Sequence, residues 1–349
     1  MRRWVALIGI VALIAACGGD GDGGSDTTAA SGTTDGATET TGASGEMTSL
    51  TVLLPVDSPN MYGFRVAVAN GYFEEENLDV TLEFVDGSGT AMQQLLAGNG
   101  EIANLGTANV AEAIEQGHDN IRAIGNVNYE SIFLLTVPED SDIQSPADLA
   151  GRSVGVSELS GGEVPVVRGM IASAGLDPDT DVEIVPIGTG TALAVQAIDE
   201  GTVDAYGGSV NDVVAVEVQG LPLRTLDPGD LSGVPALPIV TTQEFIDANP
   251  QAVEGFLRAV ARGADFGQNN PEETLEILKA ESPEQFTDET GERIFERIIE
   301  LWQPPDGVYH AQSVESWEHF FEVIAVEVPE GTDLSEIIVD DFVEAANDF

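Results

Sequence analysis

The chain repeats one glycine-rich pattern at an interval of 101 residues. Gly87-Ser88-Gly89-Thr90-Ala91 returns as Gly188-Thr189-Gly190-Thr191-Ala192. A short turn and an apolar stretch follow each copy, and then a second loop, Gly106-Thr107-Ala108-Asn109 or Gly207-Gly208-Ser209. Each copy is typical of strand, loop, helix, strand and loop. We predict that the chain builds this unit twice, once in each of two lobes, and that the four loops face one another across a cleft. The repeat alone predicts architecture and not function.

The charge balance excludes two classes of partner. The chain has 349 residues, and its 61 acidic residues against 12 basic ones give a net charge of −49. Such a surface repels phosphate groups, so we expect neither nucleic acid nor an anionic membrane surface as a partner. We interpret the charge as an acidic coat that keeps the protein soluble in high salt, which describes the habitat rather than the ligand.

The N-terminus has the pattern of a secretion signal. Met1-Arg2-Arg3 is positively charged, and residues 4–16 form an apolar run too short for a transmembrane helix. Ile14-Ala15-Ala16-Cys17 resembles a bacterial lipobox, and Cys17 is the single cysteine. We therefore predict a signal peptide at residues 1–16 and lipidation at Cys17, the alternative being a plain secretory signal with a coincidental cysteine.

A polar tether is predicted after the anchor. Residues 17–48 consist mainly of Gly, Ser, Thr, Asp and Ala, a composition that cannot bury a core. The tether would hold a globular body near the extracytoplasmic face of the cell membrane, with the lipid anchor as its only attachment.

The globular body begins near Ser49 and alternates strands with helices. This alternation predicts α/β lobes with sheets covered on both faces, and ligands of such sheets bind at the loops beyond the carboxyl ends of the strands. From Glu244 onward we expect helices, divided at Asn249-Pro250, Asn270-Pro271 and Pro304-Pro305. The predicted strands are residues 50–55, 80–85, 101–105, 121–127, 131–137, 153–156, 182–187 and 237–241.

Several stretches of the body resemble, in order, the motifs of one protein family. They are residues 70–80 (NGYFEEENLDV), 96–103 (LAGNGEIA), 148–156 (DLAGRSVGV) and the two Asn-Pro pairs. Together with the lipobox they are similar to ABC-transporter substrate-binding proteins of the sulfonate, nitrate, taurine and thiamine-precursor group, from residue 49 to about 330. Asn77 stands where the family usually has glycine, and Lys279 is the single lysine.

The resemblance implies a two-lobed periplasmic-binding-protein fold of type II with two crossing segments. Lobe 1 would comprise residues 49–135 and 238–349, and lobe 2 residues 136–237. It also implies a monomeric solute receptor, not an enzyme, that delivers a small molecule to an ABC permease with its ATPase. Such a protein needs helix N-termini and loop amides that converge on a cleft, and lobe closure over the ligand.

The candidate ligand-binding residues lie in the loops at the strand ends. Asp57 and Ser58 serve equally well as helix caps, Tyr62 and Tyr206 as core residues, and the Gly-rich loops as simple turns. The full set is Asp57, Ser58, Tyr62, Gly87, Ser88, Gly89, Thr90, Thr107, Asn109, Asn128, Tyr129, Ser160, Gly161, Thr189, Gly190, Thr191, Tyr206, Ser209, Asn211 and Asp212.

No pattern of a metal or cofactor site is present in the sequence. His118, His310 and His319 are scattered, and neither a Ser-His-Asp spacing nor a phosphate-binding loop occurs. We therefore expect no metal and no cofactor.

The charges of the loops bear on the ligand. The loops lack Arg and Lys, so a small anion such as a sulfonate would depend on helix N-termini. Acids near the loops instead favour a neutral or cationic amine-bearing heterocycle, such as a thiamine pyrimidine precursor; they are Asp57, Glu130, Glu158 and Asp212. Two alternatives stay open. One is the pyrimidine-synthesising enzyme of the same family, which consumes its own active-site histidine. The other is a tethered sensor or adhesin.

Overall fold

The computed structural model describes residues 47–159, 161–188, 190–229, 235–304, 306–326 and 328–349. The predicted signal peptide, Cys17 and all but the last two residues of the tether lie outside this part of the chain, as do Ser160 and Thr189. All described residues belong to one structural unit, residues 45–349. None of its described helices combines the length and the apolar character that a membrane crossing requires.

Five strands form the first sheet within the described residues. In spatial order they are β2 (Leu78–Phe84), β1 (Thr48–Leu54), β3 (Ile102–Asn104), β10 (Pro238–Thr242) and β4 (Ile121–Asn126). β1 is parallel to β2 and β3, whereas β10 is antiparallel to β3 and β4. The central strands are rich in buried Leu, Ile and Val because helices cover both faces.

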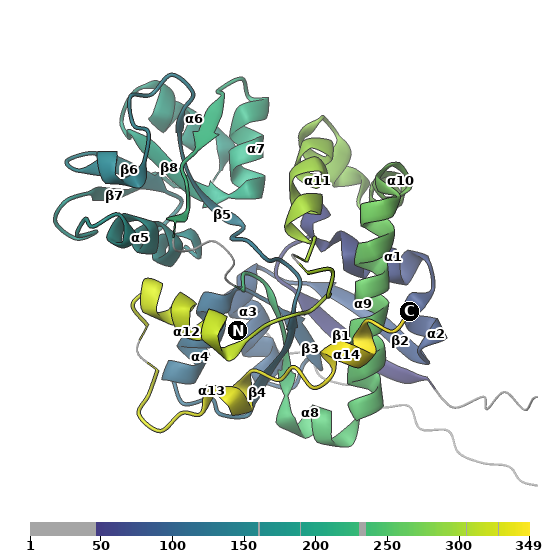
Figure 1. Cartoon of the computed structure of the whole chain (residues 1–349). Coiled ribbons are helices and arrows are strands. Elements are labelled where there is room, and N and C mark those ends of the chain that lie inside the picture. Colours follow the sequence, from purple (N-terminus) through teal and green to yellow (C-terminus); the bar gives the residue numbers. More distant parts are fainter. Residues whose placement is uncertain (1–46, 160, 189, 230–234, 305, 327) are drawn as a thin grey trace, which may run out of the picture. The chain divides into compact units, whose positions relative to one another are not determined.

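Side chains of β1 enter two cores, because alternate residues of a strand point to opposite faces. Leu53 packs on the side of α3 (Gly87–Leu96) and α4 (Thr107–Glu115). Val52 and Leu54 pack on the side of α1 (Tyr62–Ala69) and α9 (Pro250–Asn269). Figure 1 shows these two pairs of helices on opposite faces of the sheet. We call this sheet with its helices the first lobe.

The second sheet has the same plan. In spatial order its strands are β7 (Glu183–Pro186), β6 (Ser153–Val156), β8 (Ala205–Ser209), β5 (Phe133–Pro138) and β9 (Leu223–Thr225). β6 is parallel to β7 and β8, and β5 is antiparallel to β8 and β9. Its helices are η2 (Pro146–Leu149), α5 (Glu163–Ser173), α6 (Thr191–Asp199) and α7 (Val210–Val218). This sheet with its helices is the second lobe.

The two copies of the sequence repeat occupy equivalent places in the two lobes. β2, α3, β3 and α4 correspond in order and in sheet position to β7, α6, β8 and α7. Gly87 and Gly188 share a left-handed backbone, with φ of 86° and 89°. The structure therefore confirms the predicted duplication, one copy per lobe.

Two segments connect the lobes. The chain leaves the first sheet after Asn126 and enters the second at Phe133, and it returns between Thr225 and Pro238. The two crossings are hydrogen-bonded to each other: the Val127 amide donates to the Leu237 carbonyl (3.2 Å), and the Ala236 amide to the Asn128 carbonyl (3.2 Å). Asn126 supports both, because its Oδ1 accepts from the Leu237 amide (3.2 Å) while its Nδ2 donates to the Asn128 carbonyl.

The chain after β10 is helical, as predicted. Asn249 and Asn270 are the N-cap residues of α9 and α10, each with proline in the first turn. The remaining short and long helices of the described residues are η1 (Pro59–Met61), α2 (Tyr72–Glu75), α8 (Gln243–Ala248), α10 (Pro271–Glu281), η4 (Pro283–Phe286), α11 (Thr290–Leu301), α12 (Val314–Val323), α13 (Leu334–Ile337) and α14 (Val343–Ala346).

One predicted helix start is wrong. Because Gly87-Ser88-Gly89 reads as a loop, the sequence predicts a helix over residues 90–97, and in the second copy a helix from Thr191. In the structure α3 begins at Gly87. Gly87 enters the helix with a positive φ that sequence periodicity does not reveal, so the next two residues already belong to the first turn. In the second copy the helix does begin at Thr191, as predicted.

Candidate functional site

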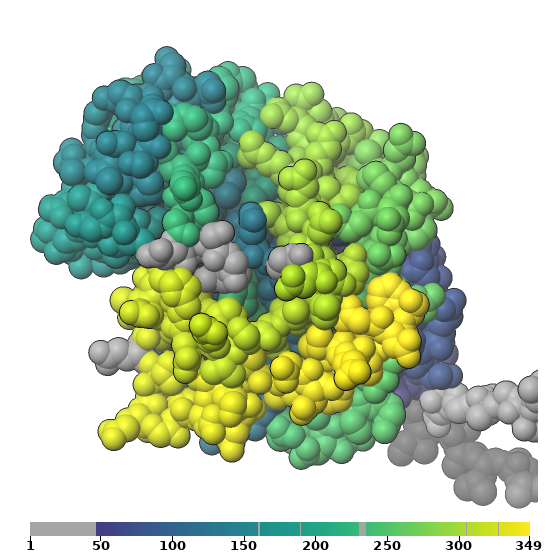
Figure 2. Space-filling view, viewed as in Figure 1, coloured from purple at the N-terminus to yellow at the C-terminus, as the bar shows by residue number. Residues whose placement is uncertain are grey.

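A cavity of about 620 Å³ lies between loops of the two lobes. This size suits a small organic molecule. The first lobe supplies the loops after β1, β2 and β3, and the second lobe supplies the loops after β6 and β8. The crossing segments add Ile132 and Leu237, and the C-terminal helices add Ile298 and Phe320. Figure 2 shows the surface hollowed where the teal second lobe faces the green and yellow helices of the first.

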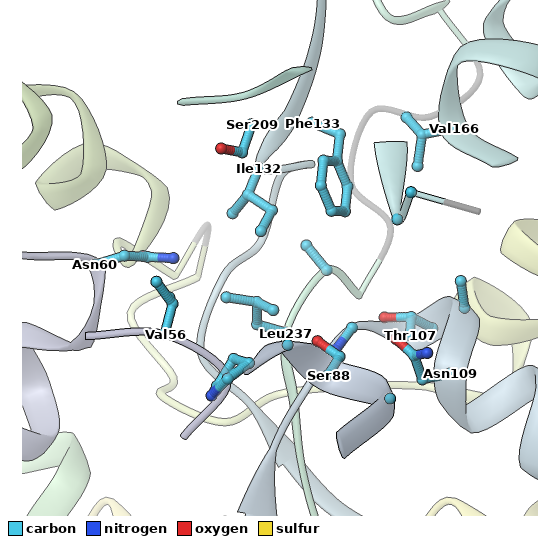
Figure 3. A pocket seen from close by; sticks show the side chains of 18 of the residues that line it. Val56, Asn60, Ser88, Thr107, Asn109, Ile132, Phe133, Val166, Ser209 and Leu237 are labelled. Carbon is cyan, nitrogen blue, oxygen red and sulfur yellow. The ribbon is translucent and has the colours of Figure 1, made fainter. Parts of the chain in front are cut away.

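The first-lobe wall is polar and rich in hydrogen-bond donors. Ser88, Thr107 and Asn109 lie together on one side of the cavity in Figure 3. Ser88 Oγ accepts from the Gly106 amide (3.0 Å), which holds the two loops against each other. Asp86 and Gly106, the N-cap residues of α3 and α4, make no side-chain cap to these helices. The amides of Gly87, Thr107 and Asn109 already donate to backbone carbonyls, and those of Ser88, Gly89 and Ala108 remain available to a ligand.

The second-lobe wall is capped by its own side chains. Ser209 and Asp212 form a capping box at the start of α7, with the Ser209 hydroxyl donating to Asp212 Oδ2 (2.6 Å). At the start of α5, the Glu163 carboxylate accepts from the Ser157 amide (2.9 Å). Since these carboxylates already satisfy loop donors, this wall offers fewer free amides than the first. Its apolar contribution to the cavity comes from Phe133 and Val166, beside the exposed carboxylates of Glu158 and Asp212.

Every charged side chain among the described lining residues is acidic. These residues are Asp86, Glu112, Glu158 and Asp212, and all four are exposed to solvent. No Arg, Lys or His belongs to the described lining. The buried Arg65 is engaged elsewhere, because it pairs with Asp57 and lies 4.5 Å from the centre of the Phe84 ring. The cavity thus carries a negative potential that disfavours anions.

The structure brings half of the predicted residues to the cavity. The lining includes Gly87, Ser88, Gly89, Thr90, Thr107, Asn109, Gly161, Ser209, Asn211 and Asp212. It does not include Asp57, Ser58, Tyr62, Asn128, Tyr129, Gly190, Thr191 and Tyr206. Ser160 and Thr189 lie outside the described residues. Of the four Gly-rich loops, three contribute to the wall, and the described residues of the 188–191 loop do not.

Three of the residues away from the cavity have structural partners at the end of β1. Asp57 pairs with Arg65 and accepts from the Ser282 hydroxyl (3.1 Å). Ser58 caps η1, since its Oγ accepts from the Asn60 amide (3.1 Å). Tyr62 is buried against Trp302, with ring centroids 4.7 Å apart, and burial raises the pKa of its hydroxyl.

The other residues away from the cavity lie in the crossing segments and in the second lobe. Asn128 is fully buried, and neither polar atom of its side chain has a partner. The Tyr129 hydroxyl accepts from the His310 amide (2.7 Å). Tyr206 is buried against Gly208, and burial raises the pKa of its hydroxyl. Glu130, which we considered with the ligand-facing acids, is exposed and does not line the cavity.

The sequence did not reveal several residues of the wall. Asn60 is one of them; it is 4% exposed, and its Oδ1 accepts from Trp302 Nε1 (3.2 Å). The position of Asn60 two residues after the helix cap Ser58 is the sequence signal that could have identified it. Glu112 lies three residues after Asn109 on the same face of α4, a spacing that sequence also gives. The apolar contributors Ile132, Phe133 and Val166 carry no such signal. In the described chain, no group of three His, Cys, Asp or Glu is placed to hold a metal ion.

Comparisons with known proteins identify relatives of this chain. The chain is 26% identical over 261 residues to the formylaminopyrimidine-binding protein of Halalkalibacterium halodurans, covering 72% of this chain and 77% of that protein. It is 28% identical over 257 residues to a 4-amino-5-hydroxymethyl-2-methylpyrimidine phosphate synthase of Legionella pneumophila, covering 69% of this chain and 76% of the synthase.

Among solved structures, the periplasmic aliphatic sulphonate binding protein SsuA from Escherichia coli superposes with a TM-score of 0.69 at 18% identity. The match covers 84% of this chain and 92% of SsuA. This similarity shows the fold, a two-lobed α/β periplasmic-binding-protein fold, as the sequence motifs predicted. The model of the protein family described as "NMT1/THI5 like" matches residues 58–274, which is more than half of the chain. The chain therefore belongs to the NMT1/THI5-like family.

Proposed function

We propose that this protein is the extracytoplasmic solute-binding component of an ABC importer. The observation that carries the proposal is the cavity between two lobes that are joined by paired crossing segments. A receptor of this kind closes its lobes around a solute and releases it to a permease, without chemistry at the site. We expect it to act as a monomer with a membrane permease and its ATPase.

The ligand that fits this cavity best is a small, neutral or cationic heterocycle with an amine. Four acids and no cation stand on the described lining, while apolar side chains supply surface for a flat ring. The formylaminopyrimidine-binding relative supports this class. An alkanesulfonate is disfavoured, because the first-turn amides of α3 and α4 would have to outweigh the surrounding carboxylates.

Mass spectrometry of ligand retained on the purified protein tests the ligand class directly. Calorimetric titration with formylaminopyrimidine and with an alkanesulfonate should give binding of the first and little or none of the second. A sulfonate that binds more tightly would contradict the proposed class, although it would leave the receptor role intact. No compaction and no thermal shift with any sulfonate, pyrimidine, flavin or amine would contradict the receptor role itself.

Charge-neutralising variants separate the role of the acids from general stability. Glu112→Gln should weaken binding of an aminopyrimidine that carries a positive charge. Added salt should reduce the difference in affinity between the variant and wild type. Glu115→Gln is the matched control, because Glu115 lies on the same helix, is also exposed and does not line the cavity. Equal effects of the two variants would contradict a direct role for Glu112.

An enzymatic alternative is raised by the synthase relative. The histidines give it no support, since none of the three is among the described lining residues. His310 is buried, with Nε2 2.8 Å from the Leu257 carbonyl and Nδ1 3.3 Å from the Asn126 carbonyl. Incubation of the purified protein with formylaminopyrimidine should leave the masses of the pyrimidine and of the protein, its histidines included, unchanged. Any turnover would establish the alternative.

We further propose attachment to the outer face of the cell membrane through a lipid on Cys17. The support is the lipobox-like sequence at the single cysteine, followed by a polar tether. Expression in a bacterial host with labelled palmitate should label wild type and leave Cys17→Ser unlabelled. No label in wild type would return the segment to a plain secretory signal, and equal labelling of both proteins would contradict attachment at Cys17.

A further inference from the structure

Asn60 occupies a special place in the cavity wall. It lies in η1, at the end of the loop after β1, and is nearly buried. Its backbone amide donates to Ser58 Oγ, so the turn that carries it is fixed from the N-terminal side. Ser58 in turn contacts Asn211 of the second lobe, with Asn211 Nδ2 3.1 Å from Ser58 Oγ. Asn60 therefore sits where the two lobes already touch.

Trp302 determines which way the Asn60 amide points. The indole Nε1–H can only donate, so the group 3.2 Å from it must be the Asn60 oxygen and not the nitrogen. The indole itself cannot turn away. It is 1% exposed, packs against Tyr62 and Phe64, and covers Gly63, where a Cβ would overlap the ring.

The consequence is that Asn60 presents its nitrogen to the cavity. Figure 3 shows the side-chain nitrogen pointing inward, on the side of the cavity opposite Val166. Within the described residues this NH₂ group donates to no acceptor. When the lobes close and exclude water, a donor of this kind loses free energy unless the ligand supplies an acceptor.

We propose that Asn60 Nδ2 is the donor that recognises a ring nitrogen or carbonyl oxygen of the ligand, and that Trp302 is the positioning residue that fixes its polarity. This inference rests on the proposed function and refines its ligand class. The ligand then carries an acceptor on the Asn60 side and an amine on the side of the acids. A saturated amine or an all-carbon ring satisfies only the second requirement.

A matched pair of probes tests the acceptor requirement. The probes are 4-amino-2-methylpyrimidine and 3-methylaniline, which share shape and substituents but differ in the two ring nitrogens. At pH 8 both are uncharged, and the carbocycle is the more hydrophobic of the two. We expect wild type to prefer the pyrimidine by about 10- to 100-fold in calorimetric affinity, the scale of one unpaired buried donor.

Variants then assign the preference to the proposed pair. Asn60→Ala should reduce the pyrimidine preference to a few-fold, with the remainder due to helix amides. Trp302→Phe keeps the ring packing and removes the donor, so the Asn60 amide can turn over and the preference should fall as well. Trp317→Phe is the control: Trp317 is equally buried, donates to Gln312 Oε1 (3.3 Å) and does not line the cavity. Its preference should remain at the wild-type value.

The outcomes are distinct. Equal wild-type affinity for the two probes, or an unchanged preference in Asn60→Ala, would overturn this inference and leave the proposed function standing. If Trp317→Phe lost the preference for the pyrimidine to the same extent as Trp302→Phe, Trp302 would have a packing role only. A wild-type protein that binds neither probe would overturn the proposed ligand class and this refinement together.

Discussion

His310 is a single residue that ties three parts of the first lobe together. It stands in the segment after α11, and its ring nitrogens face the carbonyls of Leu257 on α9 and Asn126 at the end of β4. Its backbone amide donates to the Tyr129 hydroxyl of the crossing segment. Complete burial lowers the pKa of the imidazole to about 4, from the usual 6.5. The neutral ring is therefore part of the fold.

This burial predicts a stability loss in mild acid. Below pH 6.5 the unfolded chain takes up a proton that folded His310 refuses until about pH 4, so its contribution is complete above 6.5 and falls as the pH drops. The loss should approach about 3 kcal/mol near pH 4. Urea unfolding at pH 7.5 and 4.5 measures it, with His310→Asn as comparison because asparagine tolerates the positive φ of 66°. The variant should lose less stability between the two pH values than wild type. Parallel losses would contradict the assignment to His310.

The equivalent glycines of the repeat should respond to alanine in opposite ways. Gly89 lines the cavity, its φ is not positive, and a new Cβ would find its nearest neighbour, Asn109 Nδ2, at 3.9 Å. Gly89→Ala should therefore weaken ligand binding several-fold by filling space, and leave stability equal or higher by up to about 1 kcal/mol. Gly190 does not line the cavity and has φ of 116°. Gly190→Ala should leave binding unchanged and destabilise by about 1–3 kcal/mol. Calorimetry measures the binding and urea unfolding the stability. Weaker binding in Gly190→Ala together with unchanged binding in Gly89→Ala would contradict the site.

At the scale of elements, the repeat made much of the fold predictable. Glycines at corresponding positions and strand-helix alternation were sufficient to place β2-α3-β3 and β7-α6-β8 as equivalent units. The resemblance to the family motifs predicted that the two units belong to two lobes joined by two crossing segments. The pattern could not show which loops line the cavity. The 188–191 loop and the 87–90 loop have the same sequence character, but among the described residues only those of the 87–90 loop belong to the lining.

The rotation of α1 about its axis explains why Asn60 lines the cavity and the predicted Tyr62 does not. From its apolar residues the sequence predicts a helix over residues 61–70, in which Tyr62 could face either the cleft or the core. In the structure a 3-10 turn, Pro59–Met61, precedes α1 and fixes its rotation. This turn buries Tyr62 against Trp302 and leaves Asn60 toward the cavity. The partner that decides the matter is 240 residues or more away in the chain, and local periodicity carries no information about it.

Helix α7 of the second lobe contacts helix α11 of the first lobe through ion pairs. The Glu217 carboxylate accepts from Arg293 and from Arg297, each at 3.1 Å, and its side chain is 8% exposed. Glu217→Ala removes the carboxylate that both guanidinium groups share and leaves Arg293 with its longer contact to Glu289 (3.9 Å). Because both arginines are 39% exposed, we expect a loss of about 1–3 kcal/mol rather than the larger cost of a fully buried pair.

The control for this link is Glu289→Ala. Glu289 also faces Arg293, but at 3.9 Å and with 64% of its side chain exposed, so its loss should change stability by less than about 0.5 kcal/mol. Urea unfolding of both variants decides the matter. Equal stability of the two would contradict a stabilising role for the α7–α11 contact.

At the scale of the whole molecule, like charges dominate. With 61 acidic and 12 basic residues, most carboxylates have no cationic partner, and even the ligand cavity is bordered by acids. Ion pairs such as Arg258 with Glu76 (2.7 Å) are local exceptions. Their attraction and the general repulsion are both screened by salt, and the large excess of acids determines which effect prevails.

We therefore expect salt to stabilise the folded chain. Between 0.1 and 1 M KCl the screening length falls from about 10 to about 3 Å, which removes repulsion across the surface but leaves contacts at 3 Å largely intact. The melting temperature should rise by on the order of 5 °C. NaCl at equal ionic strength should give the same rise, because screening does not distinguish the two cations, whereas equal osmolality of sucrose controls for exclusion effects. A flat or falling melting temperature would mean that the few ion pairs outweigh the acidic surface, and the acidic composition would then need an explanation other than tolerance of salt.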